Sequence, residues 1–157
     1  MSNLARVAIA LGSNLGHRHE HLSFARERLA RLLTDFRMSS IFETDPVDVP
    51  GVQAPFLNAA AVGDTTLTPR QFLESLQDIE QAAGRERPFP GAARTLDLDL
   101  ILFGSLIVNE PQLTVPHSRF RERRFVLEPL VEIAPGLRDP VTSFTVAELL
   151  ARLPPAR

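Results

Sequence analysis

The chain has no cysteine and no lysine among its 157 residues. Without cysteine it can form no disulfide, no thiolate metal site and no thiol nucleophile. Without lysine it is neither a P-loop enzyme, which needs a lysine on the β/γ-phosphates, nor a pyridoxal enzyme, which needs a Schiff-base lysine. All 17 basic residues are arginine. Any phosphate chemistry must therefore rely on arginine, metal ions and backbone N–H groups.

Long apolar runs and a strong net charge are also missing. The apolar run at residues 7–11 is too short for a signal peptide, and no segment approaches the length of a membrane span. The formal charge of −2 argues against a dedicated nucleic-acid binder. We expect one domain over residues 1–157, acting in the cytoplasm as a monomer on small molecules, with no nucleic-acid or membrane partner.

The apolar periodicity predicts alternating strands and helices. Strands are expected at residues 6–11, 36–42, 56–62 and within 94–104, with helices at 17–33 and 69–83. A short edge strand is expected at residues 106–108. Thr68 and Thr145 each begin a capping-box pattern that marks a helix start, and a further helix is expected at 126–134, with Pro129 in its first turn. The order β-α-β-β-α-β is typical of a ferredoxin-like α+β sheet with helices packed on its face, here followed by additional C-terminal helices.

Residues 94–104, RTLDLDLILFG, place two carboxylates one residue apart in a predicted strand. Strand alternation puts Asp97 and Asp99 on one face, about 6.6–6.8 Å apart along the chain. Two carboxylates on one face repel unless a cation lies between them, which indicates a divalent-metal site. Taken alone, however, such a pair of aspartates more often marks a solvated acidic strand edge, so the metal site depends on the rest of the chain.

Two long loops flank the predicted strands. Residues 43–55 carry three prolines and a glycine, and residues 85–94 bracket a proline- and glycine-containing loop with three arginines. Loops of this length in a compact domain are usually functional, and arginines beside paired aspartates suggest a phosphate clamp. Phe56 and Asn58 share one face of their strand. They could stack on a heterocycle and hydrogen-bond its edge, or serve as a core aromatic and a turn residue.

Several motifs together resemble one family over essentially the whole length. They are residues 10–16 (ALGSNLG), 56–60 (FLNAA), 94–99 (RTLDLD), 113–117 (LTVPH) and 132–135 (EIAP), with Glu43-Thr44, Glu80, Arg85, Arg87, Arg123 and Phe125. The chain is identified as a member of the hydroxymethyldihydropterin pyrophosphokinases of folate biosynthesis. The resemblance implies transfer of the β,γ-pyrophosphoryl group of ATP to the hydroxymethyl oxygen of 6-hydroxymethyl-7,8-dihydropterin, releasing AMP.

The resemblance also implies roles for individual residues. Asp97 and Asp99 would bind two Mg²⁺ ions that bridge the ATP phosphates and lower the pKa of the substrate hydroxyl. The pterin ring would lie between two phenylalanines, with its edge hydrogen-bonded to an amide and to backbone groups. The implied pterin residues are Thr44, Val47, Phe56, Asn58 and Phe125, and the implied ATP residues are Gln77, Glu80, Arg94, Thr114, His117 and Arg123. Arg85 and Arg87 would close over the phosphates, acting in catalysis with Arg94.

Three departures from the family pattern bear on this assignment. The loop at residues 85–94 lacks the tryptophan that many members carry, and Phe89 is the candidate replacement. Gln112 stands where some members have a phosphate-binding arginine, which Arg119 or Arg121 could replace. Ser118 follows the histidine where an aromatic residue is common. The alternatives left open are a two-metal phosphohydrolase, a ferredoxin-like RNA-binding module and an inactive homologue.

Overall fold

The computed structural model describes residues 3–14, 16–44, 55–84 and 96–155. One antiparallel sheet is built from five strands in the order β2-β4-β1-β5, with β3 also pairing with β4. A separate hairpin joins β6 and β7. The strands are β1 (Ala5–Ser13), β2 (Thr34–Met38), β3 (Phe42–Thr44), β4 (Phe56–Thr65), β5 (Asp97–Phe103), β6 (Val108–Glu110) and β7 (Leu113–Val115). The strand order and antiparallel pairing confirm the predicted ferredoxin-like α+β arrangement.

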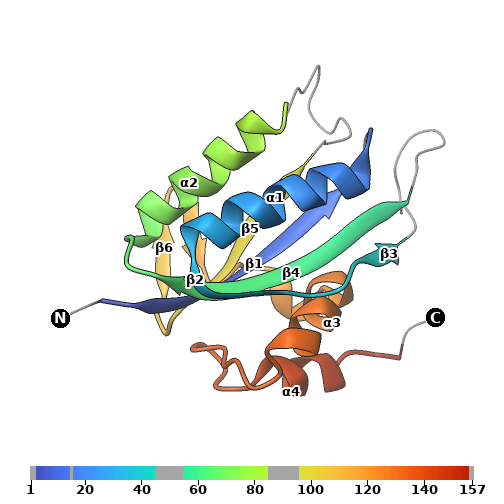
Figure 1. Cartoon of the computed structure of the whole chain (residues 1–157). Helices are drawn as coiled ribbons and strands as arrows, with labels where there is room; N and C mark the ends of the chain where they lie inside the picture. Colours follow the sequence, from blue (N-terminus) through green and yellow to red (C-terminus); the bar gives the residue numbers. More distant parts are fainter. Residues whose placement is uncertain (1–2, 15, 45–54, 85–95, 156–157) are drawn as a thin grey trace.

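Helices cover both faces of this sheet (Figure 1). α1 and α2 lie on one face, whereas α3 and α4 lie on the other. The helices are α1 (Arg18–Leu32), α2 (Pro69–Ala82), the 3₁₀ helix η1 (Phe120–Glu122), α3 (Arg124–Ile133) and α4 (Val146–Ala151). Among the described residues, no helix is both long enough and apolar enough to cross a membrane.

Strand alternation divides the core into two layers. Val7, Ile9 and Leu11 of β1 point toward α1 and α2, whereas Ala8 points toward α3 and α4. The layer between the sheet and the helices α1 and α2 was predictable from the sequence, because both helices carry regular apolar stripes. In the second layer the sheet supplies small side chains such as Ala8, which lets α3 pack closely against the strands.

The predicted helix starts are confirmed where capping patterns mark them. The Thr68 hydroxyl accepts a hydrogen bond from the Gln71 backbone N–H, and the Gln71 side chain accepts one from Thr68 N–H. Thr145 and Glu148 form the same reciprocal pair at the start of α4. Capping is a local interaction within four residues, so the sequence alone identifies it.

Several expected boundaries were wrong. The strands expected at 6–11 and 56–62 extend to Ser13 and Thr65. The single strand expected at residues 36–42 is two strands, β2 and β3, separated at residues 39–41, and β3 continues into the expected loop as far as Thr44. An edge strand expected at residues 106–108 is instead β6, which starts only at Val108. α3 begins at Arg124, two residues before the expected start, so Pro129 lies inside the helix instead of in its first turn.

Candidate active site

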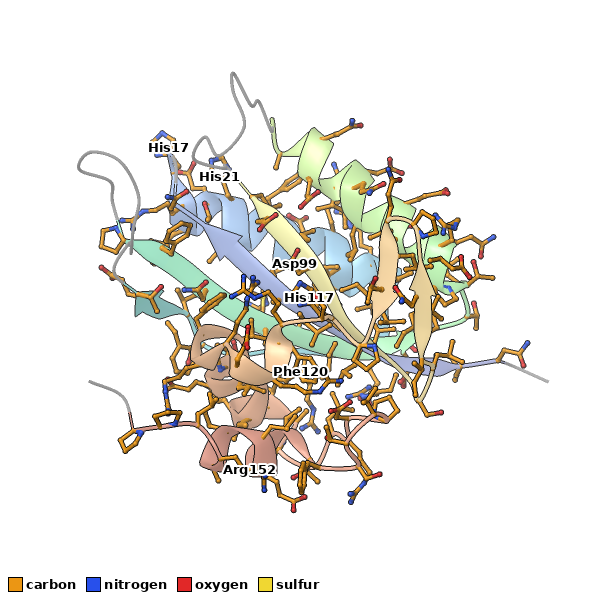
Figure 2. All side chains as sticks on the ribbon, turned by 180° about the vertical axis from the view of Figure 1, so that it is seen from behind. His17, His21, Asp99, His117, Phe120 and Arg152 are labelled. Atoms are coloured by element: carbon orange, nitrogen blue, oxygen red, sulfur yellow. The ribbon has the colours of Figure 1, made fainter. Side chains whose placement is uncertain are left out.

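Asp97 and Asp99 are the first and third residues of β5 and share the face of the sheet that α3 covers. Leu98 and Leu100 belong to the core layer beneath α1 and α2, and the two half-buried aspartates alternate with them. Figure 2 shows Asp99 projecting from β5, with His117 next to the same strand. The predicted alternation of this strand is therefore confirmed, and both carboxylates occupy the α3 side.

Glu80 of α2 fixes the start of β5 from the opposite face. Its side chain is only 5% exposed, and its Oε2 accepts a hydrogen bond of 2.8 Å from the Leu98 backbone N–H. A buried carboxylate needs such donors to offset the loss of water. The structure thus places Glu80 where it holds the strand that carries both aspartates; its predicted contact with ATP stays a prediction.

The part of β1 that lies between β4 and β5 carries very small side chains on the α3 face, and we call this row of Ala10 and Gly12 the floor of the site. Gly12 of β1 pairs with Asn58 on one side and with Asp97 on the other. In the next row on the same face, Ala10 separates Ala60 from Asp99. A Cβ built at Gly12 would meet Asn58 Oδ1 at 3.7 Å and the Leu57 carbonyl at 3.8 Å, which are ordinary contacts. The fold itself therefore tolerates a side chain at Gly12.

Three of the residues predicted to bind the pterin are neighbours on β3 and β4. Asn58 is buried, and its Nδ2 donates a 2.8 Å hydrogen bond to the Thr44 hydroxyl. Phe56 pairs with Thr44 in the strand register and is half-buried. An amide held in this way keeps a defined orientation at the edge of the floor. The fourth, Val47, lies outside the described residues.

A hollow of about 890 Å³ lies between β3 and the start of α3. Phe125 is 43% exposed on its wall, and the Arg123 guanidinium lies 5.6 Å from the centre of the Phe125 ring. The lining residues are Phe42, Glu43, Thr44, Arg119, Glu122, Arg123, Arg124, Phe125, Glu128 and Pro129. Phe125, predicted as one face of the pterin site, therefore lines the hollow; Phe56 is not in its described lining.

His117 is held next to β5 and is predominantly neutral at pH 7. Its backbone N–H donates to the Ile101 carbonyl, and its Nδ1 accepts a 3.1 Å hydrogen bond from the Arg119 backbone N–H. Burial, followed by the nearby Arg123 and Arg119 charges, lowers the pKa of His117, while the Asp97 carboxylate opposes this shift. A neutral ring that accepts at Nδ1 carries its proton on Nε2, so Nε2 is a hydrogen-bond donor.

The remaining predicted ATP residues are more dispersed. Gln77 is exposed on α2, and Thr114 is exposed on β7. Gln112 lies in the turn between β6 and β7, where its φ of 65° places it in the left-handed region. Arg85, Arg87 and Arg94, together with the proposed lid residue Phe89, lie outside the described residues.

The two arginines considered as substitutes for a charge at Gln112 both have carboxylate partners. Arg121 donates hydrogen bonds of 2.6 and 3.0 Å to Asp139, which is completely buried. Arg119 donates through Nε to Glu122 at 2.9 Å. Arg121 is therefore held by Asp139 in the C-terminal part of the chain. Arg119 lines the hollow and forms only an exposed ion pair, so it is the better candidate for binding phosphate in place of an arginine at position 112.

Sequence reasoning missed Gly12 and Phe42. Gly12 follows the strand expected at 6–11, but the structure places it inside β1, and the glycines of residues 10–16 are uninformative by themselves. Its position becomes clear only from the register, which puts it between Asn58 and Asp97. Phe42 pairs with Asn58 and lines the hollow, and its alternation with Thr44 could have indicated a shared face if β3 had been recognised as a separate strand.

Comparison with known proteins gives a consistent result. The family model for 7,8-dihydro-6-hydroxymethylpterin-pyrophosphokinase (HPPK) matches residues 8–135. The chain is 40% identical over 153 residues to the 2-amino-4-hydroxy-6-hydroxymethyldihydropteridine pyrophosphokinase of Pseudomonas aeruginosa, covering 96% of this chain and 93% of that protein. It is 44% identical over 148 residues to the Bacillus subtilis protein of the same name, covering 91% and 85%.

Larger proteins contain a similar unit. The chain is 40% identical over 142 residues to the mitochondrial folate synthesis bifunctional protein of Arabidopsis thaliana, covering 90% of this chain but 25% of that protein. Among solved structures, Plasmodium falciparum HPPK-DHPS matches with a TM-score of 0.76 at 13% identity, covering 97% of this chain. The chain spans 45% of the length of that protein, and this likeness supports the fold alone.

Proposed function

Because the chain belongs to the 7,8-dihydro-6-hydroxymethylpterin-pyrophosphokinase family, we propose that the α3 face of its sheet is the active site. The protein is an ATP-dependent diphosphotransferase of folate biosynthesis, which transfers the β,γ-pyrophosphoryl group of ATP to the hydroxymethyl group of the pterin. The observation that carries the site assignment is the strand register, which puts Asn58, Gly12 and Asp97 in one row across β4, β1 and β5.

We propose that Asp97 and Asp99 hold the magnesium ions that ATP-dependent phosphoryl transfer requires, two in number. The donor set fits this metal. Among the described residues no group of three or more His, Cys, Asp or Glu side chains could enclose an ion. Mg²⁺ is commonly bound by one or two carboxylates, with water and substrate phosphates as the other ligands. When bound, the metal neutralises phosphate oxygens and lowers the pKa of the attacking hydroxyl.

Thr44, Val47, Phe56, Asn58 and Phe125 are proposed to bind the pterin. Asn58 and Thr44 are already hydrogen-bonded to each other, so the amide presents a fixed donor–acceptor edge. Phe125 offers an exposed ring on the wall of the hollow, which suits stacking on a flat heterocycle. This arrangement would direct the substituent of the ring along the floor from Asn58, past Gly12, toward Asp97.

Gln77, Glu80, Arg94, Thr114, His117 and Arg123 are proposed to bind ATP, and Arg85 and Arg87 to act with Arg94 on the transferring group. The lowered pKa of His117 favours a neutral ring whose Nε2–H can donate to a phosphate oxygen. Arg123 adds a permanent positive charge near the same ring. Little covalent work is required of the protein in such a transfer, so positioning and charge stabilisation carry the catalysis.

We further propose that residues 1–157 act as a single domain, as a monomer and in the cytoplasm. The one-domain proposal is supported by the second core layer, in which Val146 and Leu149 of α4 pack with Ala8 and Val62 of the sheet. The match to nearly the full length of the Pseudomonas aeruginosa relative supports the same unit. The hollow of about 890 Å³ is large enough for a small-molecule substrate.

The test is ATP turnover with Mg²⁺ in the presence and absence of hydroxymethyldihydropterin, with AMP resolved from ADP. AMP formed only with the pterin is expected from the wild-type chain. Asp97→Asn and Asp99→Asn should each lower kcat by at least about 100-fold, because charge stabilisation of the transition state is lost. The matched control is Asp78→Asn, on the exposed side of α2, which should retain full turnover.

Two outcomes would contradict the proposal. Formation of ADP and phosphate without the pterin would identify a phosphohydrolase. Aspartate variants at positions 97 and 99 that turn over like Asp78→Asn would place the metal site elsewhere.

A further inference from the structure

The hollow has two walls that come from distant parts of the chain. One wall is β3, with Phe42, Glu43 and Thr44, and the other is the segment from Arg119 to Pro129. β3 is only three residues long, and within the described part of the chain its strand partner is β4. The distance between these walls sets the space for a flat ligand between Thr44 and Phe125. A contact that ties β3 to α3 would therefore control the width of the hollow.

The chain between β2 and β3 contains a bulge. Met38 pairs with Ala61 and Phe42 with Asn58, so three residues of this segment stand opposite two of β4. Ser39 remains attached to β4, because its backbone N–H donates to the Ala60 carbonyl and its hydroxyl accepts from the Ala60 N–H at 2.9 Å. A bulge re-aims the extra residue away from the strand ladder. Here the next residue, Ser40, is bonded to α3 instead.

Glu132 of α3 accepts both hydrogen bonds that Ser40 can donate. Its Oε1 accepts from the Ser40 backbone N–H at 2.8 Å, and its Oε2 accepts from the Ser40 hydroxyl at 2.7 Å. These two hydrogen bonds lower the pKa of Glu132, so the carboxylate is ionised at neutral pH. Charge-assisted hydrogen bonds to both oxygens fix the side chain in one position.

Glu132 lies on the same face of α3 as the wall of the hollow. Phe125, Glu128 and Glu132 are spaced i, i+3 and i+7, which places them along one side of a helix. Phe125 and Glu128 line the hollow, and Glu132 follows about one turn beyond Glu128. The Ser40–Glu132 contact therefore joins the two walls at one end of the hollow.

We propose that Glu132 is a positioning residue for pterin binding, because its contact with Ser40 sets the spacing between β3 and the Phe125 end of α3. The inference rests on the proposed function, which assigns the pterin to this hollow. Glu132 itself touches no substrate in this scheme. Loss of the contact leaves β3 paired with β4 but removes its link to α3 at Ser40, so the separation between Thr44 and Phe125 is held less tightly. The ATP residues beside β5 are held by other contacts, among them His117 N–H to Ile101 and Glu80 to Leu98.

The test measures KM for the pterin and for ATP in Glu132→Ala, Glu132→Gln, Ser40→Ala and the double variant Glu132→Ala/Ser40→Ala. Glu132→Ala should raise the pterin KM roughly three- to five-fold, the scale expected for charge-assisted hydrogen bonds that are exposed to solvent, with the ATP KM within about two-fold of wild type. Glu132→Gln should rescue most of this loss, because its amide can accept from Ser40 N–H and donate to the hydroxyl oxygen. Ser40→Ala should be milder and add nothing in the Glu132→Ala background.

The matched control is Glu74→Ala, an exposed helical glutamate on α2, which should leave both KM values unchanged. All rates are compared well below the melting temperature of every variant. If Glu132→Ala and Ser40→Ala lower only the melting temperature and leave the pterin KM at the wild-type value, Glu132 is merely structural and the proposal is wrong. Equal increases in both KM values would overturn it as well.

Phe125→Ala separates this proposal from the function it rests on. A raised pterin KM in Phe125→Ala, together with a normal one in Glu132→Ala, would overturn the positioning role alone. An unchanged pterin KM in Phe125→Ala would overturn the assignment of the pterin to the hollow, whatever the Glu132 variants do.

Discussion

At Gly12 the fold accepts a side chain, whereas the proposed chemistry favours glycine. Its φ is not in the left-handed region, and a Cβ there would make only ordinary contacts with Asn58 and Leu57. Neither backbone strain nor packing therefore requires glycine. Its position between Asn58 and Asp97 gives a functional reason for glycine. A side chain at residue 12 would occupy space between the proposed pterin residues and the aspartates.

Gly12→Ala should accordingly separate folding from activity. The free energy of unfolding should be unchanged or rise by up to about 1 kcal/mol, because alanine reduces the entropy of the unfolded chain. The pterin KM should rise or kcat should fall by about ten-fold or more, because one methyl group narrows the path between the pterin edge and the aspartates. Urea unfolding and steady-state kinetics measure the two effects. Gly63→Ala is an instructive contrast, since its Cβ would come within 2.7 Å of Leu33 Cβ and should destabilise the fold.

At the residue scale, the sequence predicts side-chain direction well and partners poorly. Strand alternation places Asp97 and Asp99 together because it depends only on the two-residue period. The Glu80–Leu98 and Ser40–Glu132 contacts join residues 18 and 92 positions apart. Local sequence patterns cannot predict contacts between residues so far apart in the chain, because these contacts arise from the packing of α2 and α3 on the sheet.

At the element scale, η1 and the segment after α3 are joined by a buried ion pair. Asp139 is fully buried and accepts two hydrogen bonds from Arg121, one from the Thr142 hydroxyl and one from Val141 N–H. Burial by itself would raise the pKa of Asp139, but these donors hold it at about 2. Arg121 lies between Arg119 and Arg123 in the sequence, so this pair anchors the wall that carries both of them.

Stability should therefore fall in acid through Asp139. Its pKa is depressed from 3.8 to about 2 on folding, so its contribution is fully present above pH 4 and is lost as pH falls through about 2. By linkage, this amounts to about 2 kcal/mol of unfolding free energy. Asp139→Asn should cost about 3 kcal/mol at pH 7, because Arg121 is left without its charge partner. The penalty should shrink by about 2 kcal/mol at pH 2, where the wild-type carboxyl is about half protonated in the folded protein and almost fully protonated in the unfolded chain.

Urea unfolding at pH 7 and pH 2 measures this difference. Asp35→Asn is the control: its exposed pair with Arg6 should contribute less than about 1 kcal/mol, and asparagine tolerates the positive φ of 48° at this position. A penalty for Asp139→Asn that is the same at both pH values would show that the ionised carboxylate is not what stabilises this segment.

The elements themselves were predictable to different degrees. α2 and α4 begin where the capping boxes predict, because each box is complete within four residues. The β2–β3 division was missed because the bulge at residues 39–41 depends on pairing with β4, a strand nearly 20 residues away. The start of α3 was placed too late because Pro129 reads as a first-turn proline; here it lies inside the helix and lines the hollow.

At the scale of the whole molecule, one sheet serves two core layers. Neighbouring residues of β1 belong to opposite layers, with Val7 and Ile9 beneath α1 and α2 and Ala8 beneath α3 and α4. Strand order and fold class were predictable from the β-α-β-β-α-β order, since few topologies satisfy it. The layer under α3 was less evident, because its sheet residues mix alanine with larger side chains such as Ile101 and Leu102, and its helices are short.

This sharing predicts that the two layers unfold together. Leu149 of α4 is 5% exposed and packs in the second layer, whereas Leu29 of α1 is fully buried in the first. Leu149→Ala and Leu29→Ala should each cost about 2–5 kcal/mol, and each should shift one cooperative transition without changing its slope. The strands connect the layers through the same backbone hydrogen bonds, so neither layer can lose its packing while the sheet stays intact. The chain has no tryptophan or tyrosine, so far-UV circular dichroism and amide hydrogen exchange are the suitable probes. A separate unfolding transition of Leu149→Ala at low denaturant, with faster amide exchange only in α3 and α4, would contradict this prediction. It would show that the α3–α4 layer unfolds independently while the sheet stays folded.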